Sequence, residues 1–327
     1  AAIAACLLGA MTTLGYRDLA VGLGVAVAAV LAYKQPLHGL VYKLDRDDVY
    51  AGLRLLIATF IVLPLLPAEP VDPWGALRPR SLWMLVLLIS SLSLVGYVAT
   101  RLLGARRGIP LTGLTGGLVS STAVTLAFSR QSRDPAYAAA VPALASGILL
   151  AWGVMFVRVI VEVLVVNREL LPLLVVPFGA MAAVAGVAAW FLRHGSKLGA
   201  RAETVPLRNP FSLTAAAKFA AFFALVLLVV QLVQAYAPGR GLYFVAALAG
   251  TTDVDAITLS MAQYARGGDP QLAVRAITIA ALSNTVIKAG MVMVLGGRAL
   301  RRPLLLSTAA IIATGAIAML LVQPALS

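Results

Sequence analysis

The chain has 327 residues, of which 61% are hydrophobic and only 12% are charged, and its mean hydropathy is +0.94. Soluble domains typically carry about 25% charged residues, so this composition excludes a soluble globular protein and predicts a polytopic membrane protein. The formal net charge is +13, but Lys and Arg flank apolar segments and form no separate basic domain. We therefore expect membrane lipids, and no nucleic acid, as the partner of these charges.

Cysteine and histidine are scarce: Cys6 lies in an apolar segment, and His38 and His194 lie among loop charges. The single cysteine excludes an internal disulfide and a cysteine-based metal site, and we expect the two histidines to be solvated loop residues and not zinc or haem ligands. We expect no cofactor other than a bound inorganic ion such as Mg²⁺ or Na⁺. The chain opens on AAIAACLLGA without a Met or a basic n-region, which favours a piece of a longer protein over a signal peptide.

Apolar runs that can cross about 30 Å of hydrocarbon, or nearly so, recur along the whole chain. Because every backbone polar group must be satisfied in lipid, these runs predict helices. The predicted fold is an all-α, polytopic transmembrane bundle of about 10–11 membrane segments. The runs lie at about 1–14, 19–33, 50–67, 82–103, 111–129, 137–165, 171–192, 214–236, 242–263, 271–296 and 303–323.

The longest hydrophilic link, RHGSKLGARAETVPLRNP, begins at Arg193 and separates two halves of the apolar region. It predicts a first half at 49–192, a linker at 193–213 and a second half at 214–327. Residues 1–48 form a separate helical region in this division.

Two stretches suggest that the halves are a diverged internal repeat. Gly117–Leu126 reads GLVSSTAVTL and Gly250–Leu259 reads GTTDVDAITL, and the two share Gly, Ala, Thr and Leu at matching places. Ser120 and Thr122 of the first stretch correspond to Asp253 and Asp255 of the second. Polar groups at membrane depth are costly and tend to mark pathways or sites, so the two repeat centres are where function is expected.

Segment 111–129 holds many glycines and hydroxyl side chains, which predicts a broken or re-entrant helix. The Lys and Arg residues divide evenly between the two sides if every segment spans, whereas they collect on one side if this segment is re-entrant. Re-entrance of 242–263 rests on the repeat similarity. With both re-entrant, the halves are inverted, as in many secondary transporters. An even division is also compatible with dual insertion as an antiparallel homodimer.

Asp253 and Asp255 are two residues apart, so on a helix they diverge and in an extended stretch they share a side. If the chain unwinds there, both acids could bind a metal cation, with neutral oxygens from Thr252, Ser120 and Thr122 completing the shell. Na⁺, Mg²⁺ and Ca²⁺ all favour such oxygen ligands. The alternative is that both acids cap a shorter helix in the headgroup region.

Asn284 and Lys288 interrupt the apolar segment 271–296 and lie one turn apart on the same helix face. A lysine at bilayer depth requires a partner, and Asp253 or Asp255 is the expected one. This pair could be a structural ion pair or a functional counter-ion. Arg158 and Glu162, also one turn apart, are expected to neutralise each other as a structural pair.

Nothing in the sequence indicates an enzyme. An intramembrane aspartyl protease needs acids from two separate helices, but the positions that match the two aspartates are Ser120 and Thr122. GLTGG and GLVSS lack the lysine and the spacing of a phosphate-binding loop.

Three runs resemble the core of a known family: GARRGIPLTGLTGGLVSSTAVTLAFSR, ASGILLAWGVMFVRVIVEVLVVN, and GTTDVDAITLSMA followed by ALSNTVIKAGMVMVLGG. The family is a bacterial integral membrane domain of unknown function that follows an MgtC/SapB domain, and the resemblance extends from about Ala51 to the end. Residues 1–48 resemble the tail of MgtC/SapB-type helices, although the characteristic N-terminal motif is absent. The resemblance implies a bacterial inner-membrane protein loosely associated with magnesium homeostasis, with no established substrate.

From the sequence we expect an ion transporter or channel for cations, with a midplane site between the repeat centres 117–126 and 250–259. The alternative is a membrane regulator that transports nothing and binds another membrane complex. An unpaired internal carboxylate favours the first function, and polar residues that are all caps or paired favour the second.

Overall fold

The computed structural model describes residues 2–15, 20–21, 23–24, 46–72, 77–99, 108–194, 213–236 and 240–321. These residues lie in helices, turns or connecting segments. The chain divides into two compact units, Ala1–Val49 and Tyr50–Ser327. The first contains α1 (Ala2–Thr13). The predicted linker 193–213 lies, apart from its ends, outside the described residues.

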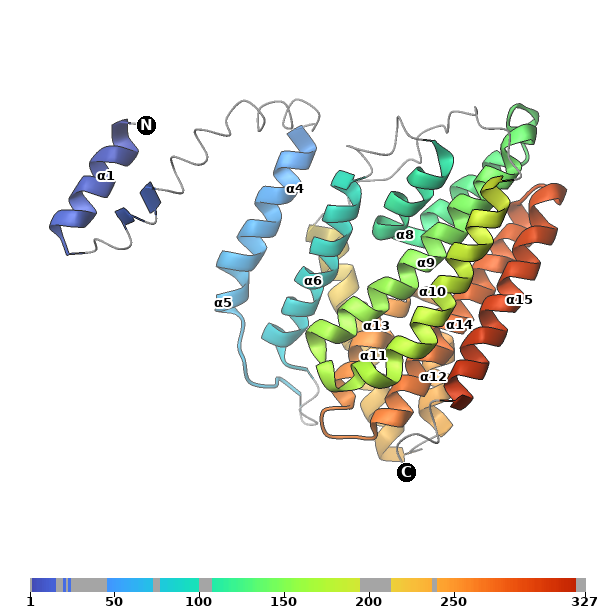
Figure 1. Cartoon of the computed structure of the whole chain (residues 1–327). Helices are drawn as coiled ribbons and strands as arrows, with labels where there is room; N and C mark the ends of the chain where they lie inside the picture. Colours follow the sequence, from blue (N-terminus) through green and yellow to red (C-terminus); the bar gives the residue numbers. More distant parts are fainter. Residues whose placement is uncertain are drawn as a thin grey trace. The chain divides into compact units, whose positions relative to one another are not determined.

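The second unit is a helical bundle (Figure 1). Among the described residues, five helices are long and apolar enough to cross a membrane, and shorter apolar helices accompany them. The predicted all-α membrane bundle is confirmed. Its helices are α4 (Arg46–Ile57, which begins in the first unit), a π-helix (Ala58–Val62), α5 (Leu63–Leu65), α6 (Pro79–Ala99), α8 (Ile109–Gln131), α9 (Val141–Val166), α10 (Leu171–His194), α11 (Leu213–Tyr236), α12 (Arg240–Thr252), α13 (Val254–Tyr264), α14 (Pro270–Leu295) and α15 (Arg298–Leu321), with 3₁₀ turns at Pro135–Ala140 and Arg168–Leu170.

Two long helical segments, which lead into α9 and α14, each begin with an Asp-Pro pair of residues. The carboxylate of Asp134 accepts a hydrogen bond of 2.9 Å from the backbone N–H of Ala136, ahead of the 3₁₀ turn that leads into α9. The carboxylate of Asp269 accepts one of 2.8 Å from Gln271 at the start of α14. The aspartate satisfies a free N–H, and the proline after it needs no partner for its nitrogen.

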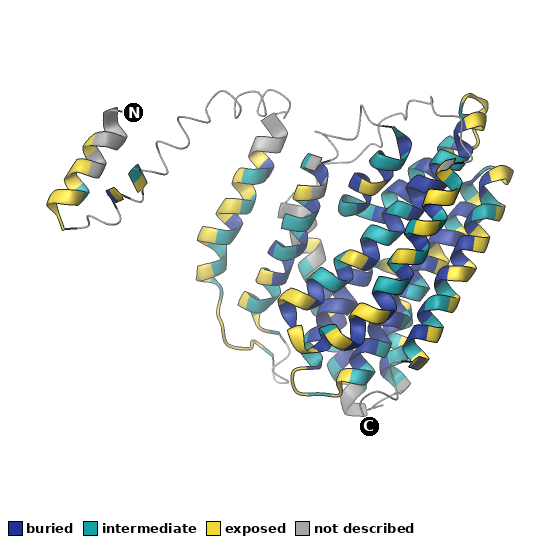
Figure 2. Cartoon of the chain, in the orientation of Figure 1, coloured by how far each residue is buried: buried dark blue, intermediate teal, exposed yellow. Residues whose placement is uncertain are grey.

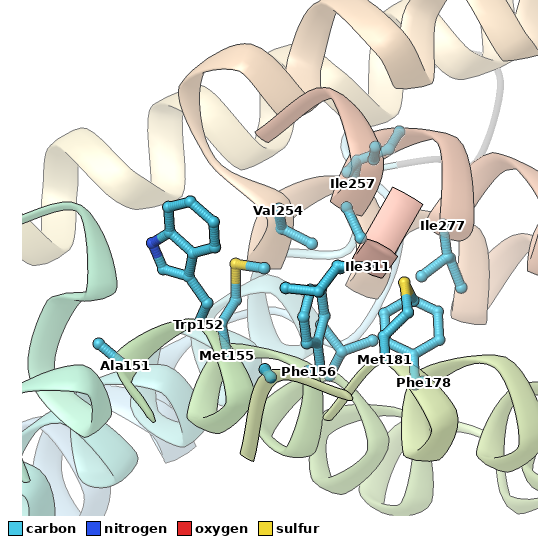
Figure 3. Close-up of a cluster of buried hydrophobic side chains, with 14 of the residues drawn as sticks. Ala151, Trp152, Met155, Phe156, Phe178, Met181, Val254, Ile257, Ile277 and Ile311 are labelled. Atoms are coloured by element: carbon cyan, nitrogen blue, oxygen red, sulfur yellow. The ribbon is translucent and has the colours of Figure 1, made fainter. Parts of the chain in front are cut away.

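Helix α9 lies at the centre of the bundle and packs against α8, α10, α13 and α15. Figure 2 shows that buried residues gather where these helices meet and that exposed residues lie on the outer helix faces. In Figure 3, side chains of α9 such as Trp152 and Phe156 face Val254 and Ile257 of α13. Phe156 also packs edge-to-face on Phe178 of α10, with ring centroids 6.2 Å apart. This packing holds α13 firmly against α9.

Helix α8 reverses its direction in the middle. Its first half runs parallel to α9, because Gly113 packs on the backbone of Gly147 and Gly117 packs on that of Ala151. Its second half runs back, because Phe128 again lies against Gly147, beside the carbonyl of Ile109. In a straight helix, residues 19 positions apart would be separated by roughly 28 Å. Although α8 is long enough to span a membrane, it is a helical hairpin, so the predicted break is confirmed, whereas its re-entrance into the membrane from one side stays a prediction.

The turn of this hairpin is at Ser120, whose backbone is extended (φ −164°, ψ 107°). The chain is interrupted in the same way between α12 and α13, at Asp253 (φ −154°, ψ 135°). Ser120 and Asp253 occupy the same position in the two aligned sequence stretches. The equivalence of the complete halves stays a prediction.

The two interrupted segments end at opposite ends of the bundle. In Figure 1, α8 lies in the upper part of the bundle and α12 in the lower part. The α8 hairpin ends beside the last turn of α14, where Arg133 donates to the carbonyl of Val294 and the backbone N–H of Gly297 donates to Ser132 Oγ at 2.9 Å. The α12–α13 segment ends beside the last turn of α9, where Arg266 donates to the carbonyl of Val166. Since α9 begins shortly after α8 ends, α9 and α14 are antiparallel and their last turns mark opposite ends.

Candidate functional site

A cavity of about 470 Å³ lies where the two interruptions meet. Its wall is formed by side chains of α6, α8, α9, α11, α13 and α14 together with the end of α12. All the site residues predicted from the sequence line it: Ser120, Thr122, Thr252, Asp253, Asp255, Asn284 and Lys288. The structure therefore brings together residues that are more than a hundred positions apart in the chain. Whether they bind an ion stays a prediction.

The tip of α8 contributes hydroxyl groups. Ser120 Oγ accepts a hydrogen bond of 3.2 Å from the backbone N–H of Ala123 and so caps the second half of the hairpin. An extended serine that accepts from the third residue after it is the ordinary geometry of a helix N-cap. Ser121 and Thr122 follow on this first turn and also line the cavity.

The tip between α12 and α13 contributes the acids. Asp253 is the N-cap of α13, and its Oδ1 accepts a hydrogen bond of 3.2 Å from the backbone N–H of Asp255. Asp255 is buried in the first helical turn. The chain is unwound only at Asp253, so the two carboxylates do not lie on one extended stretch. The capping role considered from the sequence is correct for Asp253, but the cap lines the cavity.

Arg158 of α9 connects the acids to both tips. Its guanidinium forms an ion pair with Asp255, a second one with Glu162 at 3.1 Å, and a hydrogen bond of 3.4 Å to the carbonyl of Leu118 in α8. The expected pair with Glu162 is present. However, Arg158 does not serve this pair alone, because it also lines the cavity and binds Asp255.

Sequence reasoning therefore missed Arg158 as a site residue. The available signal was an arginine in the middle of an apolar segment, which is costly in a membrane and is rarely without function.

Glu162 lies one turn further along α9 and is completely buried. Its Oε1 accepts from Arg158, whereas its Oε2 has no hydrogen-bond partner. A buried carboxylate oxygen without a partner costs free energy, so Glu162 depends strongly on the positive charge of Arg158.

Lys288 of α14 reaches the other tip. It is 1% exposed, and its Nζ donates to Ser121 Oγ at 2.7 Å and contacts Met155 Sδ at 2.9 Å. The sequence predicted Asp253 or Asp255 as its partner. Asp255 pairs with Arg158 instead, and Asp253 shares the cavity wall with Lys288 without an ion pair between them.

Asn284, one turn before Lys288, donates to the carbonyl of Gly250 at 2.8 Å. Gly250 lies close to the end of α12, and it packs on the backbone of Ala280 so tightly that a Cβ would come within 2.6 Å of the Ala280 Cα. Asn284 therefore stabilises the interruption between α12 and α13. It has this structural role in addition to lining the cavity.

The site combines three carboxylates, Asp253, Asp255 and Glu162, with two basic groups, Arg158 and Lys288. With all five ionised, the sum is one negative charge. Among the described residues there is no group of three or more His, Cys, Asp or Glu side chains that could hold a metal ion. In the part of the chain that the structure describes, Asp253 is the cavity acid without an ion pair to an arginine or lysine.

Comparison with known proteins identifies the family of this chain. Residues 87–296 match the model of a domain of unknown function, DUF4010. The chain belongs to this family. The matched region includes both interrupted segments and all the site residues, whereas residues 1–48 lie outside it. The comparisons show no MgtC/SapB domain, so the resemblance of residues 1–48 to such helices stays a prediction. An uncharacterized protein of Aquifex aeolicus (strain VF5) is 31% identical over 196 residues, which cover 58% of this chain and 84% of that protein. No solved structure matches.

Proposed function

We propose that this protein is an integral membrane transporter or channel for a small cation, and that the cation binds in the cavity between the two tips. The observation that carries the proposal is the meeting of two interrupted helical segments, which come from opposite ends of the bundle, at a polar cavity. Its wall holds Asp253 and Asp255 together with Arg158 and Lys288, and a third acid, Glu162, is paired with Arg158 just outside the wall. Interrupted helices near the midplane form the ion and substrate sites of many secondary transporters.

The two tips would supply complementary ligands. Asp253 contributes a carboxylate, and Ser120, Thr122 and Thr252 contribute hydroxyl oxygens. The interruptions also leave backbone carbonyls without helical partners at the ends of the first half of α8 and of α12. Such hard oxygen atoms suit alkali and alkaline-earth cations.

One observation supports the alternative of a membrane regulator that transports nothing. Most polar groups of the site have partners within the protein: Asp255 pairs with Arg158, Asn284 binds a carbonyl, and Asp253 caps α13. A network of polar groups that only stabilises the fold, however, does not explain two features of the site. These are the cavity of about 470 Å³ and Asp253, the cavity acid that forms no ion pair with an arginine or lysine among the described residues.

The proposal also includes a location in a bacterial inner membrane with anionic lipids around the bundle. Its support is the spacing of apolar helices, the basic flanks and the family resemblance. A homodimer stays a proposal of the same kind.

The test is ion flux in liposomes that contain the purified protein, together with thermal stabilisation of the protein by added cations in detergent. We expect cation-dependent flux and stabilisation in the unmodified protein, loss of both in Asp253→Asn, and only a weaker response in Ser120→Ala. The asparagine keeps a side-chain oxygen for the cap but removes the charge. If the folded Asp253→Asn variant kept the full cation response, the site would lie elsewhere and the regulator function would be favoured.

A further inference from the structure

We propose that the cavity selects a monovalent cation and that Lys288 sets this selection by acting as a fixed internal positive charge. The inference rests on the proposed function, because it names the class of cation that the same site takes. It departs from the expectation of magnesium that the family resemblance implies.

The first step is the charge of the empty site. Asp253, Asp255 and Glu162 supply three negative charges, and Arg158 and Lys288 supply two positive ones, which leaves one negative charge. A monovalent cation brings the sum to zero, whereas a divalent cation leaves an uncompensated positive charge. Uncompensated charge in a buried, low-dielectric site is strongly unfavourable.

The second step is that neither base can leave easily. Arg158 is held by Asp255, Glu162 and the carbonyl of Leu118. Lys288 is almost fully buried and is held by Ser121 and Met155. A bound divalent ion would have to share the cavity with both positive charges.

The third step is the ligand set. Asp255 is occupied by Arg158, so Asp253 is the carboxylate left for the ion, and the remaining donors are neutral hydroxyl and carbonyl oxygens. One carboxylate with neutral oxygens matches the charge of Na⁺ or a similar ion. Tighter sites for Ca²⁺ gather a larger count of charged ligands.

The experiment changes the charge sum without touching a proposed ligand of the ion. Glu162→Gln removes one negative charge at a position outside the cavity wall, and Lys288→Gln removes one positive charge. The double variant restores the original sum. Glu169→Gln removes an exposed negative charge outside the cavity wall and is the matched control. Apparent dissociation constants for NaCl, KCl and MgCl₂ are obtained from thermal unfolding at constant ionic strength, with choline chloride as the balance.

We expect the unmodified protein and Glu169→Gln to respond to a monovalent cation and not to Mg²⁺. Glu162→Gln should weaken monovalent binding about tenfold, because a unit charge about 10 Å away at an effective dielectric constant of about 20 has this effect. Lys288→Gln should create a Mg²⁺ response, and the double variant should return to the original preference.

The outcomes separate the inference from the proposed function. If Mg²⁺ stabilises the unmodified protein as well as monovalent cations do, or if Glu162→Gln leaves monovalent binding unchanged, the charge-sum selection is wrong although a cation site exists. If the folded, unmodified protein responds to no cation at all, the proposed function itself fails. If Lys288→Gln does not fold, the charge-sum selection is still tested by comparing monovalent binding in Glu162→Gln with that in the unmodified protein.

Discussion

Replacing Arg158 by methionine tests the core of the site, because this side chain neutralises two buried acids at once. Glu162 is completely buried, the Asp255 side chain is 7% exposed, and both form ion pairs with the one guanidinium. Methionine replaces the apolar stem of arginine with one of similar length but lacks the guanidinium, so both carboxylates are left without a cation. Breaking a buried ion pair in this way typically costs about 3–5 kcal/mol.

For a protein of this size, that loss corresponds to a fall in Tm of roughly 4–7 °C. The assay is thermal unfolding in detergent, followed by tryptophan fluorescence, with a light-scattering record of aggregation. Adding Glu162→Gln to Arg158→Met should recover about 1–3 kcal/mol, because one of the two unpaired charges is then removed. Arg158→Lys should lose an intermediate amount, since a single ammonium cannot bridge two carboxylates as a planar guanidinium does.

The reasoning would be refuted by an Arg158→Met variant with an unchanged Tm. It would also be refuted if the losses from Arg158→Met and Glu162→Gln simply added, because additive losses mean that the two groups do not interact. A network that merely fills space would produce such additivity.

Two further predictions concern the packing and the topology of the interrupted helices. Gly250→Ala should destabilise the protein by about 1–4 kcal/mol in thermal unfolding, because the new Cβ overlaps the backbone of Ala280 and displaces the Gly250 carbonyl that Asn284 binds. The control is Gly290→Ala, which should be neutral or slightly stabilising because no atom lies within 4 Å of its new Cβ. Equal effects of the two substitutions would contradict the close approach of Gly250 to Ala280. Cysteines introduced at the exposed positions Arg130 and Gly267 should be labelled by a membrane-impermeant reagent from opposite sides of the membrane. The reason is that the α8 hairpin and the α12–α13 segment end at opposite ends of the bundle. Labelling of both cysteines from one side would disprove this arrangement.

The location of the site could be predicted from the sequence because polar groups at membrane depth are expensive. Asp253, Asp255 and Lys288 stand out in apolar segments without any knowledge of the fold, and the structure places all three at one cavity. The reversal of α8 could be predicted as well, since the even division of Lys and Arg in the alternative topology conflicts with the usual asymmetry of charge.

The pairing of the charges could not be predicted. Whether Arg158 or Lys288 binds Asp255 depends on the rotation of α9 against α13, which is set by side chains such as Trp152 and Val254 at their contact. Only the pair of Arg158 with Glu162 follows from local helix geometry, and it is the pair that was expected. The contact of Lys288 with Ser121 joins α14 to α8, and no pattern within one segment indicates it.

Lys288 and Arg158 each lie on the helix that follows one interruption and contact the tip formed by the other. Lys288 belongs to the helix that follows the second interruption, yet it binds Ser121 at the first tip. Arg158 belongs to the helix that follows the first interruption, yet it binds Asp255 at the second. Arg158 also binds the carbonyl of Leu118 at the first tip, so both basic residues connect the two halves of the site. Under the proposed function, a cation that binds at Asp253 therefore occupies a site whose two tips are joined by protein contacts, which favours transport by alternating access over a continuously open channel.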